Sequence, residues 1–212
     1  NYVPSCELDT YRARIPEVPW IEPGASRQQR VTGYYRFINR EMVGTASERT
    51  FITTVVPEDV GHIHTCLTTV FRRSEDLLDF FAYSLSLPLD FRVKSTGVGH
   101  VNKSLLSQLP TLSSTGIREI LHVRTLASVC LTDHYKSLWQ LNWHPEFREQ
   151  QWTITSETKL PVLTDVQDNI DEHGHPGAHV LPQDFFANLT PEWQRDNALR
   201  SDYARRQALV EI

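Results

Sequence analysis

The sequence YYRFINREMVGTASERTFITTVVP, residues 34–57, carries the clearest structural signal of this 212-residue chain. Two runs within it, 34–39 and 50–56, are rich in aromatic and β-branched residues, the types that are enriched in strands. A polar loop that contains Gly44 separates them, so the stretch predicts a β-hairpin. Because hairpin loops usually hold about two to five residues, we expect this longer loop to project from the sheet.

Three arginines, Arg36, Arg40 and Arg49, lie on the predicted strands and at the edges of the loop. A guanidinium group donates paired hydrogen bonds to phosphate oxygens and to the guanine edge. A rigid β-ribbon that carries three such groups is therefore a candidate for a DNA-reading element.

The same stretch, followed after a helical segment by GVGHVNKSLLSQLPTL, resembles the target recognition domain of type IIG restriction and modification enzymes. Those enzymes join an adenine-specific DNA methyltransferase to a DNA-reading module and sometimes to a nuclease. The positions that match the family pattern are Tyr35, Arg36, Glu48, Arg49, Thr50, Gly99, Asn102, Lys103, Gln108, Leu109 and Pro110. The final RSDYARRQALVEI also resembles the helix that follows this domain in such enzymes.

The resemblance implies a module that lies in the major groove of double-stranded DNA and selects the site that a methyltransferase domain of the same parent chain modifies. S-adenosylmethionine and magnesium are then expected in the parent enzyme, and no cofactor in this fragment. The residues expected to contact DNA are Arg36, Arg40, Arg49, Thr50, Arg72, Arg73, His100, Asn102 and Lys103. We expect Arg49→Ala to relax site choice while the fold stays intact.

The segment STGVGHVNKSLL, residues 95–106, predicts a glycine-flanked start of a short helix that ends before Pro110. Gly97 and Gly99 permit close approach of a partner, and Asn102 is a favoured N-cap residue. With Lys103 beside it, this arrangement suits a phosphate group. The same features also fit a plain joint between a loop and a helix.

Helical periodicity is strongest in SEDLLDFFAYSLSL, residues 74–87, which Pro88 ends or kinks, and a second helical piece follows, then another helix over 116–131 and a short one through Leu138 and Trp139. Together with the hairpin these predict an α+β fold, a twisted and mainly antiparallel sheet with helices packed on one side. The expected divisions are a wrapping N-terminal segment (1–30) anchored by Trp20, a recognition core (31–145), an acidic loop-rich segment (146–189) and a truncated C-terminal helix (190–212) that opens at Thr190 and Pro191.

The net charge of -5 argues against a general nucleic-acid coat, because nonspecific affinity comes mainly from phosphate neutralisation. Between Arg27 and Lys103, however, the sequence holds 10 Lys or Arg against 8 Asp or Glu, while the rest holds 11 against 18. The small positive excess therefore coincides with the recognition-like segment. A module tethered to a larger DNA-binding enzyme can act with such an excess.

No apolar run approaches the roughly 18 to 20 residues that span a bilayer, so we expect a cytoplasmic protein with no membrane partner. The three cysteines, Cys6, Cys66 and Cys130, lack Cys-x-x-Cys spacing and predict free thiols. Because the sequence opens on Asn1 and closes on a helical pattern without a stop signal, we expect a fragment of a longer chain.

Two other functions stay open. A magnesium-dependent nuclease is suggested by a degenerate acid and Glu-x-Lys pattern, Pro145, Glu146, Glu157 and Lys159. A noncatalytic protein-interaction domain would use the exposed hairpin for docking. The histidines at 62 and 64, and those at 173, 175 and 179, fit solvated positions better than a metal site, so neither a catalytic nor a metal-binding residue is assigned.

Overall fold

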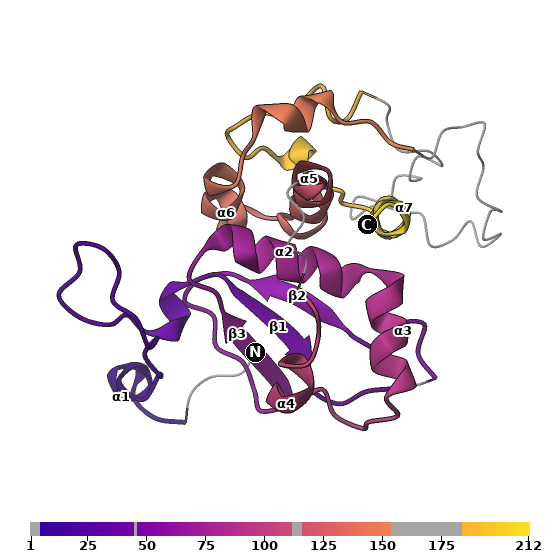
Figure 1. The fold of residues 1–212 in the computed structure, drawn as a ribbon. Coiled ribbons are helices and arrows are strands. Elements are labelled where there is room, and N and C mark those ends of the chain that lie inside the picture. The colour runs from indigo at the N-terminus through magenta and orange to yellow at the C-terminus, as the bar shows by residue number, and fades with distance from the viewer. Residues whose placement is uncertain (1–4, 45, 112–115, 154–183) are drawn as a thin grey trace.

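The computed structural model describes residues 5–44, 46–111, 116–153 and 184–212 of the chain (Figure 1). The elements are α1 (Leu8–Ala13), β1 (Arg36–Arg40), β2 (Thr53–Val56), β3 (Cys66–Val70), α2 (Ser74–Leu85), α3 (Leu87–Ser95), α4 (Lys103–Leu106), α5 (Arg118–Val129), α6 (Lys136–Leu141) and α7 (Asp202–Val210), with 3-10 turns at Val31–Gly33, Asp133–Tyr135, Pro145–Glu149 and Arg195–Asn197.

The three strands form one antiparallel sheet in the order β2-β1-β3. Phe37 in the central strand lies opposite Val55 on one side and Thr69 on the other. Because side chains alternate along a strand, these three residues point to the same face of the sheet. The predicted hairpin is confirmed as the β1–β2 pair, and the predicted α+β class with an antiparallel sheet is confirmed.

The core lies between that face of the sheet and the helices stacked over it. Phe37 is fully buried and contacts Phe80 of α2 edge-on, with ring centroids 4.9 Å apart. Figure 1 shows α2 lying on the sheet, with α5 and α6 beyond it on the same side. Trp139 of α6 and Leu199 belong to the same buried cluster as Phe37, so the C-terminal part of the chain shares the core of the predicted recognition region.

Local chemistry explains where the helices α2 and α3 begin and end. Two acidic residues, Glu75 and Asp76, lie in the first turn of α2, where the positive end of the helix dipole stabilises their negative charges. Ser86 then breaks the helix in an extended conformation, and its hydroxyl accepts a hydrogen bond from the Leu89 N–H of α3. Pro88 lies in the first turn of α3, where proline costs no hydrogen bond.

Both ends of the chain differ from expectation. The N-terminal segment contains the helix α1, and its buried anchor is Val18, whereas Trp20 is half-buried and donates a hydrogen bond to Glu22. Thr190 and Pro191 do not open the last helix; α7 begins at Asp202 with Ser201 as its N-cap. The stretch between is held against the core instead, because the Trp139 indole donates to the Thr190 carbonyl at 2.9 Å.

Candidate nucleic-acid interface

The end of β1 is joined by hydrogen bonds to the segment 97–103. The Val101 N–H donates to the Glu41 carbonyl at 2.7 Å, and the Val43 N–H donates to the Gly99 carbonyl at 3.0 Å. The buried Asn39 side chain donates to the Val101 carbonyl at 3.1 Å. The sheet thus holds this segment beside the end of its central strand.

The segment 97–103 leads from α3 into α4. Gly97 has a φ of 67°, a left-handed conformation that favours glycine, and its N–H donates to the Lys94 carbonyl at the end of α3. Asn102 caps α4 as predicted, because its side-chain oxygen accepts from the Leu105 N–H at 3.1 Å. Since α4 is a single turn of four residues, its dipole is small, and an anion here would depend on the surrounding side chains.

We call the surface formed by the end of β1, the segment 97–103 and the outer side of α3 the basic face. Its exposed cationic and polar side chains are Arg40, Arg92, Lys94, His100, Asn102 and Lys103. Its exposed apolar side chains are Met42, Leu87, Phe91 and Val98.

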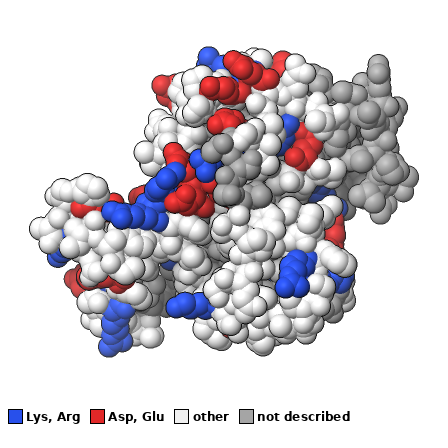
Figure 2. All heavy atoms as spheres, viewed as in Figure 1, with Lys and Arg blue, Asp and Glu red and all other residues white. Residues whose placement is uncertain are grey.

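The basic face is poor in carboxylates. Between residues 86 and 103 the sequence contains one acid, Asp90, whose side chain is buried, and the only acid next to Arg40 at the end of β1 is the half-buried Glu41. Within the described part of the chain, no carboxylate forms an ion pair with Arg40, Arg92, Lys94 or Lys103. In Figure 2, most acidic side chains lie above the region where Figure 1 places α3 and α4. The cations of this face are therefore available to an external anion.

Arg36 and Thr50 do not reach the surface, so the structure corrects their predicted role as DNA contacts. Arg36 is 1% exposed, and its guanidinium donates to the Val60 carbonyl. Burial lowers the pKa of Arg36. Strand alternation correctly places it on the face opposite Phe37, but the sequence does not reveal that the loop after β2 covers that face.

Arg49 holds the β1–β2 loop in place and is likewise not an outward contact. One of its terminal nitrogens donates to the Leu85 carbonyl at the end of α2 at 2.8 Å, and its Nε lies 3.4 Å from an Asp90 carboxylate oxygen. That oxygen also accepts the N–H groups of Thr50 and Phe51 at 2.9 and 2.7 Å. The second half of the loop is thus fastened to α2 and α3.

Arg72 and Arg73 lie at the other end of the sheet. They follow β3, whose last residue is opposite Arg36 at the start of β1, and a five-residue strand places its two ends about 14 Å apart. Arg73 is also in ion pairs with Glu75 and Asp76. These two arginines therefore do not join Arg40, His100, Asn102 and Lys103, which the structure does bring together.

Sequence reasoning missed Arg92 and Lys94 of the basic face. Both lie on α3, whose buried side is formed by Leu89, Asp90 and Val93. The helical period of the LDFRVKS segment leaves 92 and 94 outside that side. The signal was therefore present in the sequence, but its use required knowing which side of α3 meets the core.

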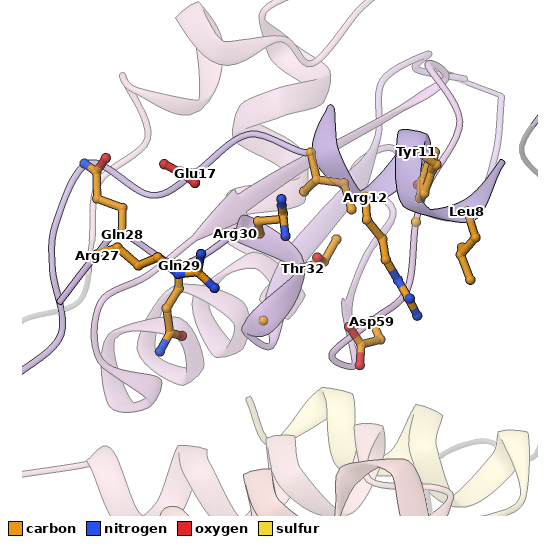
Figure 3. A pocket seen from close by; sticks show the side chains of 13 residues that line it. Leu8, Tyr11, Arg12, Glu17, Arg27, Gln28, Gln29, Arg30, Thr32 and Asp59 are labelled. Carbon is orange, nitrogen blue, oxygen red and sulfur yellow. The ribbon is translucent and has the colours of Figure 1, made fainter. Parts of the chain in front are cut away.

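A hollow of about 460 Å³, which we call the α1 hollow, opens between α1 and the segment before β1. Figure 3 shows Arg27 and Arg30 on one side of it and Arg12 on the other. Glu17 and Asp59 also line the hollow, so its charges are mixed. It is a weaker candidate for binding a polyanion than the basic face.

The residues of the nuclease-like pattern and of the histidine groups lie only partly within the described ranges. No group of three or more His, Cys, Asp or Glu there could hold a metal ion. Glu146 is exposed and bonded to His144, whereas Glu157, Lys159 and the histidines at 173, 175 and 179 lie outside the described residues. His62 and His64 precede β3 and are exposed.

Two further expectations concern cysteines and membranes. The three cysteines are free, as predicted, and burial raises the pKa of the Cys130 thiol. Among the helices of the described ranges, none is both long and apolar enough to cross a bilayer.

The structure is an α+β domain with exposed cations at one end of its sheet and on the neighbouring helices. No protein-family model, curated protein or solved structure matches the sequence.

Proposed function

We propose that this chain is a sequence-specific recognition module for double-stranded DNA, and that it directs adenine methylation, and in some settings cleavage, by other domains of a parent restriction-modification enzyme. The observation that supports this proposal is the basic face. Four cations without a carboxylate partner in the described structure lie at the end of the central strand, on α3 and at the start of α4, and backbone hydrogen bonds fasten the segment 97–103 to the end of that strand. Such fastening suits base reading, because contact geometry must be held rigidly.

The side chains of the basic face differ in the contacts they suit. The Nε of Arg40 donates to the Met42 carbonyl at 2.8 Å, which fixes the plane of a guanidinium whose outer nitrogens are able to pair with a guanine edge. Arg92, Lys94 and Lys103 suit phosphate contacts, which position the protein but do not read sequence. Asn102 uses its oxygen for the helix cap and keeps its NH₂ group for a partner.

The test is a charge reversal at the basic face. Arg92→Glu/Lys94→Glu should weaken binding to a fluorescent duplex and lower the slope of log K against log salt by about 1.8, since each phosphate contact contributes about 0.9. The matched control is Arg27→Glu/Arg30→Glu in the α1 hollow, which should leave the duplex affinity and the salt slope unchanged. Absence of duplex binding at low salt, or equal loss in the two variants, would refute the proposal.

A noncatalytic protein-interaction domain is the second candidate, because the same face exposes large apolar side chains. Phe91 is 71% exposed and Leu87 is 60% exposed, one turn apart on α3. A protein partner bound through them would show little salt dependence and would be lost in Phe91→Ala. A steep salt dependence that survives Phe91→Ala favours DNA.

A further inference from the structure

The two edges of the sheet differ in the hydrogen-bond partners of their outward backbone groups. With β1 in the centre, β2 and β3 each have one neighbouring strand. The Glu41 N–H donates to the Thr65 carbonyl at 2.9 Å, which sets the alternation of the β1–β3 ladder. By that alternation Leu67 and Thr69 bond to β1, whereas the N–H and C=O groups of Thr68 and Val70 point away from the sheet.

The outer edge of β2 has a partner. The Val55 carbonyl, which points outward, accepts the Tyr135 hydroxyl at 2.9 Å. For β3, no hydrogen bond within the described ranges reaches the outward backbone groups of Thr68 or Val70. Backbone groups of this kind are strong donors and acceptors that favour pairing.

The β3 sequence also lacks the devices that keep exposed edges from pairing. Natural edge strands carry Lys, Pro or other charged residues for this purpose. The strand Cys66–Val70 reads CLTTV, and Phe71 follows it, so six consecutive positions have neither charge nor proline. An edge of this composition is suited to accept another strand.

A groove of about 720 Å³ runs along this edge. Residues 67–71 line it, so it follows almost the whole of β3. Its apolar lining also includes Val18 and Trp20 from the segment before β1, and Leu106 and Leu109 from α4 and the turn after it. Lys103, at the start of α4, and Glu17 line the groove as well, and both are exposed.

We propose that the β3 edge binds an extended peptide segment of a partner protein by strand addition. The backbone of the peptide would pair with Thr68 and Val70, and its apolar side chains would pack against the apolar residues that line the groove. The charges in the lining specify the rest of its chemistry: an acidic residue that pairs with Lys103 and a basic one that pairs with Glu17. This inference goes beyond DNA recognition and uses a different surface, which meets the basic face at Lys103.

The first experiment selects a ligand. A phage-displayed library of random peptides is panned against the full chain, and a selected peptide is synthesised. We expect apolar peptides with both charges, bound in a 1:1 complex. Selection of no peptide above background would overturn the proposal, as would a chain that dimerises through this edge, detected by light scattering and abolished by the variant below.

The second experiment tests the geometry with paired variants. Ser107 is exposed and lines the groove, so Ser107→Trp should block it and weaken the peptide at least tenfold. The control Ser104→Trp, on the same turn but outside the groove, should change affinity less than twofold. Equal effects of the two variants would contradict docking at this edge.

The third experiment distinguishes strand addition from general apolar binding. Peptides that are N-methylated at single positions should lose binding at alternate residues, because successive N–H groups of a strand point to opposite sides. Hydrogen exchange at the amides of Thr68 and Val70 should slow when the peptide is bound. A uniform response along the peptide, or unchanged exchange at these two amides, would overturn the proposal.

Discussion

The pair formed by Arg124 and Glu211 allows a quantitative test of how the C-terminal helix is held. Both side chains are almost completely buried, 2% and 3% exposed. Two guanidinium nitrogens of Arg124 donate to one Glu211 oxygen at 2.9 and 2.8 Å, and the other oxygen accepts the Thr153 N–H at 2.8 Å. We therefore predict that Glu211→Gln, which removes the charge and keeps the shape, leaves a buried cation uncompensated.

The expected cost is about 3 to 5 kcal/mol, the range for breaking a buried ion pair from one side. A domain is stable by about 5 to 15 kcal/mol in total, so this is a large fraction. At about 2 to 4 °C per kcal/mol for a chain of this size, the melting temperature should fall by about 6 to 20 °C.

Urea denaturation followed by circular dichroism measures the effect, with Glu48→Gln as the matched control. Glu48 pairs with Arg206 at 3.2 Å, but both side chains are more than half exposed, so its loss should cost less than about 1 kcal/mol. The double variant Arg124→Met/Glu211→Leu should recover much of the lost stability, because no buried charge remains. Equal effects of Glu211→Gln and Glu48→Gln would refute this account of the helix.

Three further predictions concern buried polar groups. Asp90→Ala should cost about 2 to 4 kcal/mol in urea denaturation, because two backbone N–H groups of the β1–β2 loop lose their acceptor. Arg36→Met should leave stability unchanged or raise it, and should leave duplex affinity unchanged, because the buried Nε of Arg36 has no partner within the described structure. Burial lowers the pKa of His122, which Asp79 offsets only in part, so the folded state resists protonation. The contribution of His122 to folding stability is complete above the unfolded pKa of about 6.5 and falls as the pH drops below it. Between pH 7 and 5 the urea midpoint should therefore fall more in the native chain than in His122→Asn, and equal falls would contradict this.

The elements with local signals could be predicted from the sequence. Alternation around Phe37 indicated a strand, and the acids and apolar residues after Ser74 indicated α2, because both patterns depend on neighbours in the chain. The Asn102 cap was predictable for the same reason: a cap uses a donor three residues away.

The roles of the arginines could not be predicted in this way. Arg36, Arg40 and Arg49 are alike in sequence context, yet one is buried, one is exposed and one fastens a loop to two helices. What separates them is long-range: Val60 lies 24 positions from Arg36, and Leu85 lies 36 positions from Arg49. No local pattern encodes such partners. The structure therefore corrected the predicted site residues more than it corrected the predicted fold.

The basic face and the β3 groove are built on the same sheet, so only some variants can separate DNA binding from peptide binding. Both depend on the hydrogen bonds that hold segment 97–103 to β1, so a variant that loosens this segment would weaken DNA and peptide together. Lys103 borders both surfaces, and its substitution cannot separate them. Arg92 lies on α3 outside the groove, whereas Ser107 lines the groove. If Arg92→Glu/Lys94→Glu weakens only the duplex and Ser107→Trp weakens only the peptide, then one end and one edge of the same sheet bind different partners.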